Sequence, residues 1–239
     1  MVTLASLALT VIVELFTSEG CSSCPPADAF LKKLVETQPI EDVRIIALGE
    51  HVDYWDQLGW RDRFSSPALT ARQQAYGTRF RIDSVYTPQM VVDGRSEFVG
   101  TDAGAARRAL QQARDTVHGI VQLAVYGGPE PTTIRVAATT RQLPPLSSGD
   151  RADVVIAVTE DGLKSDVKRG ENEGKVLAHV AVVRLLSTIG EASVQDGTTV
   201  SGQIRVGADW RRENLHIVAF VQARRSRAIL ASALVEAPK

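Results

Sequence analysis

The sequence predicts an α/β domain followed by an antiparallel, sandwich-like β domain, and three observations support this prediction. In the first half, buried strand patterns alternate with segments whose apolar residues recur at helical spacing. After about residue 116, strand-like runs follow one another with Gly, Pro, Asp or Ser between them. A chain of 239 residues is long enough for two modest domains. We therefore predict domains at residues 1–116 and 117–239.

The composition of the chain argues against nucleic-acid binding and against a membrane-spanning segment. With a net charge of −1, the chain lacks the basic surface that a phosphate backbone requires, so we expect no nucleic-acid partner. No stretch reaches the roughly 18 to 20 apolar residues of a spanning helix, so we expect no membrane span. The opening MVTLASLALTVIVELF has neither a basic n-region nor a small-residue cleavage site, so no signal peptide is visible.

The first half is expected to alternate strands and helices. The run TVIVELF (10–16) is apolar on both faces, which is typical of a buried parallel strand. PADAFLKKLVET (26–37) has helical spacing, and DVRIIALGE (42–50) predicts a second buried strand. After a polar, aromatic loop, SPALTARQQAYGTRF (66–80) returns to helical spacing. The order is strand, helix, strand, helix.

A hairpin and a helix close the first half. VYTPQMVVDG and EFVG predict two short strands joined at Asp93-Gly94, a dipeptide typical of tight hairpin turns. TDAGAARRALQQARD (101–115) predicts a helix with Thr101 as its N-cap. Beyond it, strands are predicted at 121–127, 132–139, 152–160, 177–187, 200–207 and 215–222.

The motif CSSC contains the only two cysteines, Cys21 and Cys24, directly after the first strand. Unpaired backbone N–H groups at a helix N-terminus stabilise a thiolate, and Cys21 is placed to gain from them. Residues three apart on a helix share a face, so Cys24 can close a disulfide with Cys21. A permanent bridge over so short a loop would add little stability. These features favour a redox-active pair. Pro25 and Pro26 disfavour helical geometry in the residue before each, so we expect the helix to start late.

Metal binding is the competing use of the two thiols. No further cysteine is present, and the four histidines do not form the H-x₃₋₅-H pair that usually completes a zinc site. We therefore predict no metal and no cofactor. A two-coordinate Cu(I) site formed by both thiolates, with Met90 nearby, remains the alternative.

The dipeptide Thr87-Pro88 stands just before a predicted strand. Downstream of a strand, CxxC, helix, strand, helix series, this is where thioredoxin-like proteins have a cis-proline against the cysteine pair. A trans-proline opening an edge strand is the ordinary alternative. The order of the surrounding elements favours the cis form at Pro88.

Four motifs together, FTSEGCSSCPPAD, HVDYWDQLGW, SPALTARQQAY and VYTPQMVVDG, resemble the bacterial family called domain of unknown function 1223, whose first half is thioredoxin-like. The segment GLKSDVKRGENEGKVLAHVAVVR extends the resemblance into the second half. The resemblance implies Cys21 as attacking thiol, Cys24 as resolving thiol and Pro88 as the cis-proline, with Thr87 before it at the substrate. It also implies a periplasmic or secreted setting. Ser22-Ser23 differs from the Gly-Pro of thioredoxin, so no redox direction is implied.

Glu14 lies within the first apolar strand, seven residues before Cys21. A buried carboxylate there is suited to take the proton of Cys24, because burial raises a carboxyl pKa toward the range where transfer is useful. The alternative is a Glu14 that pairs with an arginine or turns to an edge.

The loop HVDYWDQLGW follows the second strand, at the sheet end where parallel α/β proteins place their sites. We expect its polar and aromatic residues to form one wall of a substrate groove. The alternative is a loop that packs onto the second domain. A lone histidine such as the one here is more often structural than a ligand. The residues expected at the substrate are His51, Asp53, Tyr54 and Trp55.

The predicted function is thiol–disulfide exchange on protein or small-molecule disulfides. The alternatives are Cu(I) delivery and a redox-inert binding module on the same fold. A homodimer is one assembly compatible with the sequence. In the second domain KRGENEGK is a polar turn, and Arg169, Glu171 and Asn172 are its candidates for interdomain contact.

Overall fold

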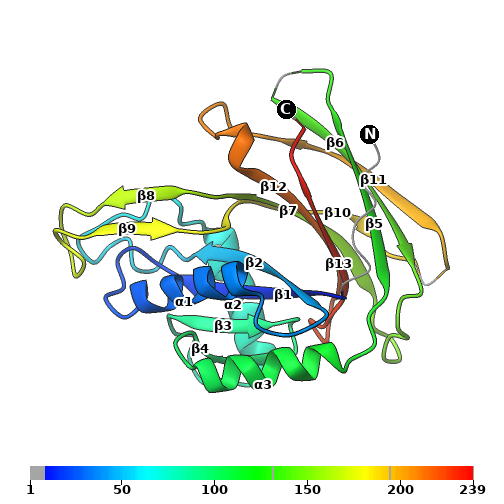
Figure 1. The fold of residues 1–239 in the computed structure, drawn as a ribbon, viewed down its shortest axis with the longest axis horizontal. Coiled ribbons are helices and arrows are strands. Elements are labelled where there is room, and N and C mark those ends of the chain that lie inside the picture. The colour runs from blue at the N-terminus through cyan, green and yellow to red at the C-terminus, as the bar shows by residue number, and fades with distance from the viewer. Residues whose placement is uncertain (1–8, 131, 194, 239) are drawn as a thin grey trace.

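A computed structural model of the chain describes residues 9–130, 132–193 and 195–238 (Figure 1). In these ranges the protein is mostly β-sheet with few helices. No helix of the described ranges is long and apolar enough to cross a membrane.

The first half has the predicted order of elements. It consists of β1 (Leu9–Thr17), α1 (Pro25–Thr37), β2 (Val43–His51), α2 (Pro67–Phe80), β3 (Gln89–Val92), β4 (Ser96–Val99) and α3 (Ala103–Arg114). Strand β1 is parallel to β2 and antiparallel to β3, which is antiparallel to β4. The N-cap of α3 is Asp102, not Thr101 as predicted, because the Asp102 carboxylate accepts the Ala105 N–H at 2.8 Å.

The second half is built of strands. They are β5 (Ile120–Gly127), β6 (Thr133–Arg141), β7 (Ala152–Glu160), β8 (Leu163–Asp166), β9 (Val176–His179), β10 (Val182–Glu191), β11 (Thr198–Arg205), β12 (Leu215–Ala223) and β13 (Ile229–Glu236). Strands β8 and β13 were not predicted, and the run predicted at 177–187 is divided between β9 and β10.

One mixed sheet of eight strands joins the two halves, in the order β13-β12-β7-β10-β2-β1-β3-β4. The join is a short parallel pairing in which Val182 of β10 lies beside Gly49 of β2. A smaller sheet, β11-β6-β5, packs across the β13-β12-β7 end, and β8 with β9 forms a separate hairpin (Figure 1). The expected sandwich-like packing is therefore present in part, but its larger layer continues into the first half.

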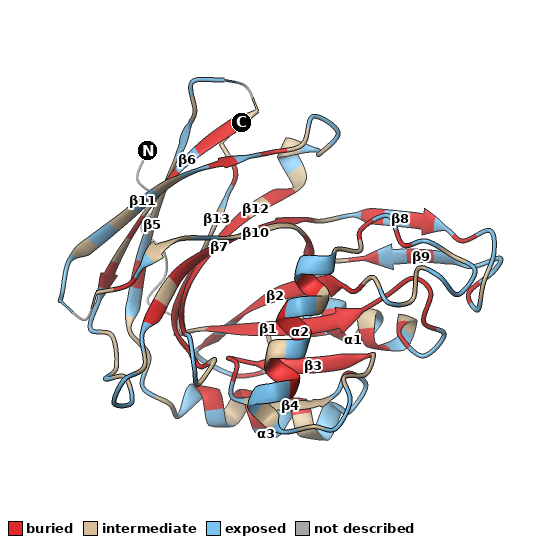
Figure 2. Ribbon diagram, turned by 180° about the vertical axis from the view of Figure 1, so that it is seen from behind, coloured by how far each residue is buried: buried red, intermediate tan, exposed pale blue. Residues whose placement is uncertain are grey.

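The helices divide between the two faces of the sheet. Val11, Val13 and Leu15 of β1 face α1 and α3, whereas Ile12 of the same strand packs on the face that α2 covers. This alternation follows from the two-residue period of a strand. The α2 face also includes Phe220 of β12, so one apolar cluster spans both halves. The central strands are buried, while much of the smaller sheet is exposed (Figure 2).

Candidate functional site

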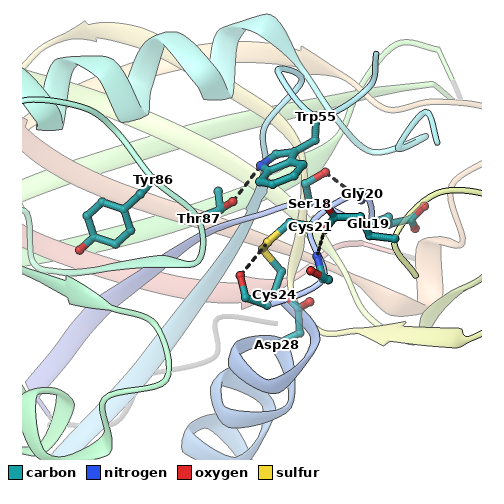
Figure 3. Close-up of a disulfide and its surroundings, with 12 residues drawn as sticks. Ser18, Glu19, Gly20, Cys21, Cys24, Asp28, Trp55, Tyr86 and Thr87 are labelled. Atoms are coloured by element: carbon teal, nitrogen blue, oxygen red, sulfur yellow. Dashed lines mark hydrogen bonds between the residues drawn. A yellow bond between two sulfur atoms is a disulfide. The ribbon is translucent and has the colours of Figure 1, made fainter. Parts of the chain in front are cut away.

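The two cysteines lie in the loop between β1 and α1 and are joined by a disulfide (Figure 3). Their Cα atoms are 5.4 Å apart. Neither cysteine has surface exposed to solvent, whereas Ser22 and Ser23 between them are exposed. The disulfide therefore lies beneath the surface with the two serines outside it.

Helix α1 begins at Pro25, directly after its N-cap Cys24, which itself has right-handed helical φ and ψ, so the late start expected from the two prolines is wrong. The Cys24 N–H donates to the Cys21 carbonyl oxygen at 3.2 Å, and the Ser23 hydroxyl lies 3.4 Å from the Cys21 sulfur. Proline is tolerated at the first helical positions because their N–H groups have no partner within the helix. The CSSC loop is thus fixed by its own backbone just ahead of the helix.

Trp55 and Thr87 form a wall beside the disulfide. The peptide bond between Thr87 and Pro88 is cis, as the sequence led us to expect. The Trp55 indole N–H donates to the Thr87 hydroxyl at 2.8 Å, and Figure 3 shows the indole beside the cysteine pair. The structure therefore brings together Cys21, Cys24, Thr87 and Trp55 of the predicted site.

Two other residues of the predicted groove turn toward α2. The Asp53 carboxylate accepts the Thr70 hydroxyl at 2.6 Å, and the Tyr54 hydroxyl donates to the Gln73 side chain at 3.2 Å. These bonds fasten the loop after β2 to α2. The structure therefore gives Asp53 and Tyr54 an anchoring role and brings neither into hydrogen bonding with the CSSC loop.

Glu14 has the arginine partner that the sequence left open. Its carboxylate accepts the Arg72 guanidinium at 2.6 Å and the Tyr76 hydroxyl at 2.5 Å, and none of its hydrogen bonds goes to Cys24. The reason is strand geometry, because Glu14 points to the α2 face whereas its neighbours Val13 and Leu15 point to α1. The expected proton transfer from Cys24 to Glu14 has no direct contact to support it.

A different carboxyl, that of Asp28, is largely buried one helical turn from Cys24. Asp28 follows Cys24 by one helical turn, and its N–H donates to the Cys24 carbonyl oxygen at 3.1 Å (Figure 3). Residues four apart on a helix face the same side. Only 11% of the Asp28 side chain is exposed, and its carboxylate lies 4.0 Å from Nδ1 of His179. Asp28 also lies in the first turn of α1, where a negative charge interacts favourably with the helix dipole.

His179 belongs to the second half, at the end of β9, and completes a network of buried acids and histidines. Its Nε2 lies 3.3 Å from the carboxylate of Glu19, which also accepts the Trp60 indole N–H at 2.8 Å. The His179 ring meets the His51 ring edge-on, with centroids 4.8 Å apart. Nδ1 of His51 lies 2.6 Å from Asp62. His51 is therefore buried within this network rather than exposed on the wall of a groove.

The electrostatics of this network follow from burial and pairing. Burial raises the pKa of Asp28, and the charges of His179 and His51 offset this only in part. Burial alone lowers the pKa of His51, but the adjacent Asp62 raises it above its usual value. Although burial raises the pKa of Asp62, His51 holds it below its usual value. The result is an Asp28 carboxyl with a raised pKa, one helical turn from Cys24, beside the His51–Asp62 pair.

The hairpin of β8 and β9 with its connecting turn, which we call the arm (residues 163–179), covers one side of the CSSC loop. The buried Asn172 amide donates to the carbonyl oxygens of Glu19 and Cys21, both at 2.9 Å, and the Glu171 carboxylate accepts the Ser22 N–H at 3.0 Å. Two of the three residues of KRGENEGK expected at an interdomain contact are thus bound to the cysteine loop. Arg169 has no such bond.

Among the residues that the structure describes, no group of three or more His, Cys, Asp or Glu is arranged to hold a metal ion. Met90, named with the Cu(I) alternative, is fully buried in the apolar cluster between the sheet and α1 and α3.

Comparisons with known proteins give a family and a fold. Protein AGR_C_4864 from Agrobacterium tumefaciens is 27% identical, with 98% of this chain and 97% of that chain covered and a TM-score of 0.69. HBP35 of Porphyromonas gingivalis is 16% identical, with 97% and 76% covered and a TM-score of 0.68, a likeness of fold. No curated protein matched the sequence. Residues 12–222 match the family described as "Protein of unknown function (DUF1223)", and the chain belongs to this family.

Proposed function

We propose that the protein is a thiol–disulfide oxidoreductase whose site is shared by a thioredoxin-like first half (1–116) and the β-rich second half (117–239). The observation that carries the proposal is the disulfide between a strand end and a helix start, next to the cis-proline segment and Trp55. The strand order β2-β1-β3-β4, with α1 and α3 on one face and α2 on the other, supports the thioredoxin-like assignment.

The exchange itself needs only the two thiols. In the reduced protein the Cys21 thiolate attacks one sulfur of a substrate disulfide, forms a mixed disulfide and releases the other substrate sulfur as a thiolate. Cys24 then loses its proton and attacks the Cys21 sulfur, which releases the second substrate thiolate and restores the Cys21–Cys24 bond. Two electrons pass from the protein to the substrate, and oxidation of a substrate dithiol is the same sequence reversed.

Asp28 is the group we assign to the proton of Cys24. It lies one turn along α1 from Cys24, and burial raises its pKa toward the range in which a carboxyl accepts and returns a proton near neutral pH. His179 and Glu19 of the buried network position it. Because His179 comes from β9, the second half supplies part of the site.

In this structure a substrate cannot reach Cys21 without a movement of the protein. A substrate sulfur has to contact the Cys21 sulfur, yet Cys21 has no exposed surface. Trp55 or the arm must therefore shift when a substrate binds. An exported setting, as the family resemblance implies, fits a protein whose only two cysteines are paired.

The test is equilibration of the folded protein in glutathione and dithiothreitol buffers, with turnover of a protein disulfide and of a small aromatic disulfide measured alongside. We expect a reversible two-electron couple, and loss of turnover in Cys21→Ser. A bridge that is reduced only when the protein unfolds, or a Cys21→Ser variant with unchanged turnover, would contradict the proposal.

A further inference from the structure

A groove runs along α2, with its mouth at the end of the helix far from the disulfide. Its outer part, about 700 Å³, lies between the last turn of α2, the β12–β13 turn and residues 147–150. An inner part of about 320 Å³ continues along the helix toward Arg72. Three of the α2 residues that line the groove are small, namely Ala68, Ala71 and Ala75, and Arg72, Thr78 and Arg79 of the same helix also line it. The spacing of the alanines places them on one side of the helix, where short side chains leave the groove open.

The charge of the outer groove is strongly positive. Five arginines and a single carboxylate line it, namely Arg79, Arg81, Arg224, Arg225, Arg227 and Asp150. The Asp150 carboxylate already accepts the backbone N–H groups of residues 151, 225 and 226. It is therefore occupied by neutral donors rather than by an arginine.

Only part of the arginine charge is compensated within the described residues. Arg224 pairs with Asp153 and Glu191. Arg79 donates to the carbonyl oxygen of Ser226, a neutral acceptor, at 2.7 Å. The guanidinium groups of Arg81, Arg225 and Arg227 have no carboxylate of the described chain within ion-pair distance. With Arg79, four positive charges thus face one groove without a carboxylate counter-ion among the described residues.

Arg227 is held in place before any ligand arrives. Its guanidinium lies over the Tyr76 ring, 5.3 Å from the centroid, and its buried Nε has no hydrogen-bond partner. Its carbonyl oxygen accepts the Gln222 side-chain amide at 2.7 Å. Burial and the nearby Arg72 charge hold the pKa of Arg227 below its usual value, which an added negative charge would reverse. Arginine in a fixed position suits planar or tetrahedral oxyanions.

The helix end alone does not account for this arrangement. Basic residues near a helix C-terminus are stabilising, which explains Arg79 and Arg81 at the end of α2. Arg225 and Arg227 lie on the β12–β13 turn, where no such benefit applies. Two independent elements therefore direct arginines into the same groove.

We propose that this groove is a binding site for a small molecule that carries a doubly charged oxyanion, a phosphate or a dicarboxylate. The site is separate from the disulfide, because α2 spans about 20 Å between its mouth and the loop after β2. Arg225 and Arg227 are its principal contacts, with Arg81 at the rim. The inner part, whose alanines stand beside polar side chains such as Ser187, Thr188 and Gln222, accommodates the rest of the ligand.

The test is isothermal titration of the oxidised full chain at low, constant ionic strength, with inorganic phosphate and with succinate. We expect one saturable site for at least one of the two anions. The double variant Arg81→Ala/Arg225→Ala should weaken binding at least tenfold. The control Arg107→Ala/Arg108→Ala removes two exposed charges from α3, and its affinity should stay within twofold of the wild type.

Tighter binding of phosphate would assign a phosphorylated ligand, and tighter binding of succinate a carboxylated one. Absence of saturable binding of both anions would overturn the proposal. So would equal weakening in the groove variant and the α3 control, because the effect would then be one of net charge. The measurement uses the oxidised protein and involves no exchange of thiols, so its result is independent of the redox function.

Discussion

Two buried carboxyls compete for the role of proton acceptor at the residue scale. Glu14 is bound by Arg72 and Tyr76 on the α2 face, whereas Asp28 follows Cys24 on α1. We expect Asp28→Asn to slow resolution of the mixed disulfide by about tenfold or more and to flatten its pH dependence. Stopped-flow measurement of resolution between pH 6 and 9 checks this.

Glu14→Gln is the matched control for that experiment. Removing one partner of a buried ion pair leaves the Arg72 charge uncompensated, at a cost of about 3 kcal/mol or more in the free energy of unfolding. The neighbouring Glu50, whose pKa burial and Glu14 raise well above the usual range, can ionise and limit the loss. The pH profile of resolution should be unchanged. A shifted profile in Glu14→Gln with a normal one in Asp28→Asn would reverse our assignment.

The His51–Asp62 pair predicts how stability depends on pH. Because the pKa of His51 is higher in the folded than in the unfolded protein, protonation of His51 stabilises the folded state. This contribution is complete below the unfolded-state pKa of about 6.5 and is lost as the pH rises through the folded-state pKa. Because the pKa of Asp62 is lower in the folded than in the unfolded protein, its ionisation also stabilises the folded state. This contribution is present above the unfolded-state pKa of about 3.8 and is lost as the pH falls through the folded-state pKa. The pair therefore stabilises most between about pH 4 and 6.5.

Thermal unfolding of wild type and His51→Gln at pH 5.5 and 8.5 tests this dependence. We expect the wild type to lose more stability than the variant on going to pH 8.5. Each tenfold difference in acid dissociation constant between the folded and unfolded states corresponds to about 1.4 kcal/mol. Equal losses in the two proteins would show that the charge of His51 contributes nothing to folding.

The site was predictable from sequence only where its residues are close along the chain. The disulfide motif and the cis form at Pro88 follow from a short pattern and from the order of elements. Asp28 and His179 lie close together although they are about 150 positions apart in the sequence, and no local sequence pattern predicts this proximity. Glu14 was correctly expected to be buried, but which face it occupies depends on the neighbouring helix.

At the element scale, the β3–β4 turn is the feature that the sequence predicted in most detail. Asp93 and Gly94 both have positive φ, 48° and 63°. They occupy the centre of a tight turn that the Arg95 N–H closes on the Val92 carbonyl oxygen at 2.9 Å, within a three-residue connection between Val92 and Ser96. A Cβ on Gly94 would lie 1.9 Å from the Arg227 carbonyl oxygen. We expect Gly94→Ala to cost about 4 kcal/mol or more, or to prevent folding. The control is Gly127→Ala, whose added Cβ meets nothing within 4 Å, and denaturant titration compares them.

The arm gives a second prediction at this scale. Asn172→Ala removes two hydrogen bonds to carbonyl oxygens that then lack this donor, so we expect a loss of about 1–3 kcal/mol. It also loosens the cover of the CSSC loop, so reduction of the disulfide by dithiothreitol should become faster. The exposed Glu173→Ala in the same turn serves as control. If the disulfide is reduced faster in the control alone, or in neither variant, the arm does not control access of a reductant to the disulfide.

The sequence predicts strand positions correctly where the apolar runs are long. It is wrong at 177–187, where contacts with distant residues determine the end of one strand and the start of the next. The run predicted at 177–187 breaks because Ala181 adopts a φ of 49° while its N–H donates to the Asp161 carboxylate at 2.7 Å. Its carbonyl oxygen accepts the Gly49 N–H at 2.8 Å. Both partners are distant in sequence, so the pattern of residues 177–187 alone could not place the break.

At the scale of the whole molecule, the sequence did not predict the eight-stranded sheet that joins the two halves. Each half predicts its own strands, but the pairing of β10 with β2 depends on a close approach at Gly49, where a Cβ would lie 3.0 Å from the Val180 carbonyl oxygen. The α2 face then buries Phe220 of β12 in one cluster with Ile12 of β1. The halves share a core as well as a sheet.

This shared core predicts a single cooperative unfolding transition. For 239 residues at about 0.7 kcal/mol per residue near 60 °C, one unit would unfold with an enthalpy of about 170 kcal/mol. Two independent units, divided near residue 116, would each give a van't Hoff enthalpy of about half that value. Scanning calorimetry of the oxidised full chain separates the two cases.

We expect the calorimetric and van't Hoff enthalpies to agree, because separating the halves would expose the β2 edge and the cluster around Phe220 together. Two resolved transitions, or a van't Hoff enthalpy near half the calorimetric one, would mean that the β10–β2 join is weaker than the shared cluster implies.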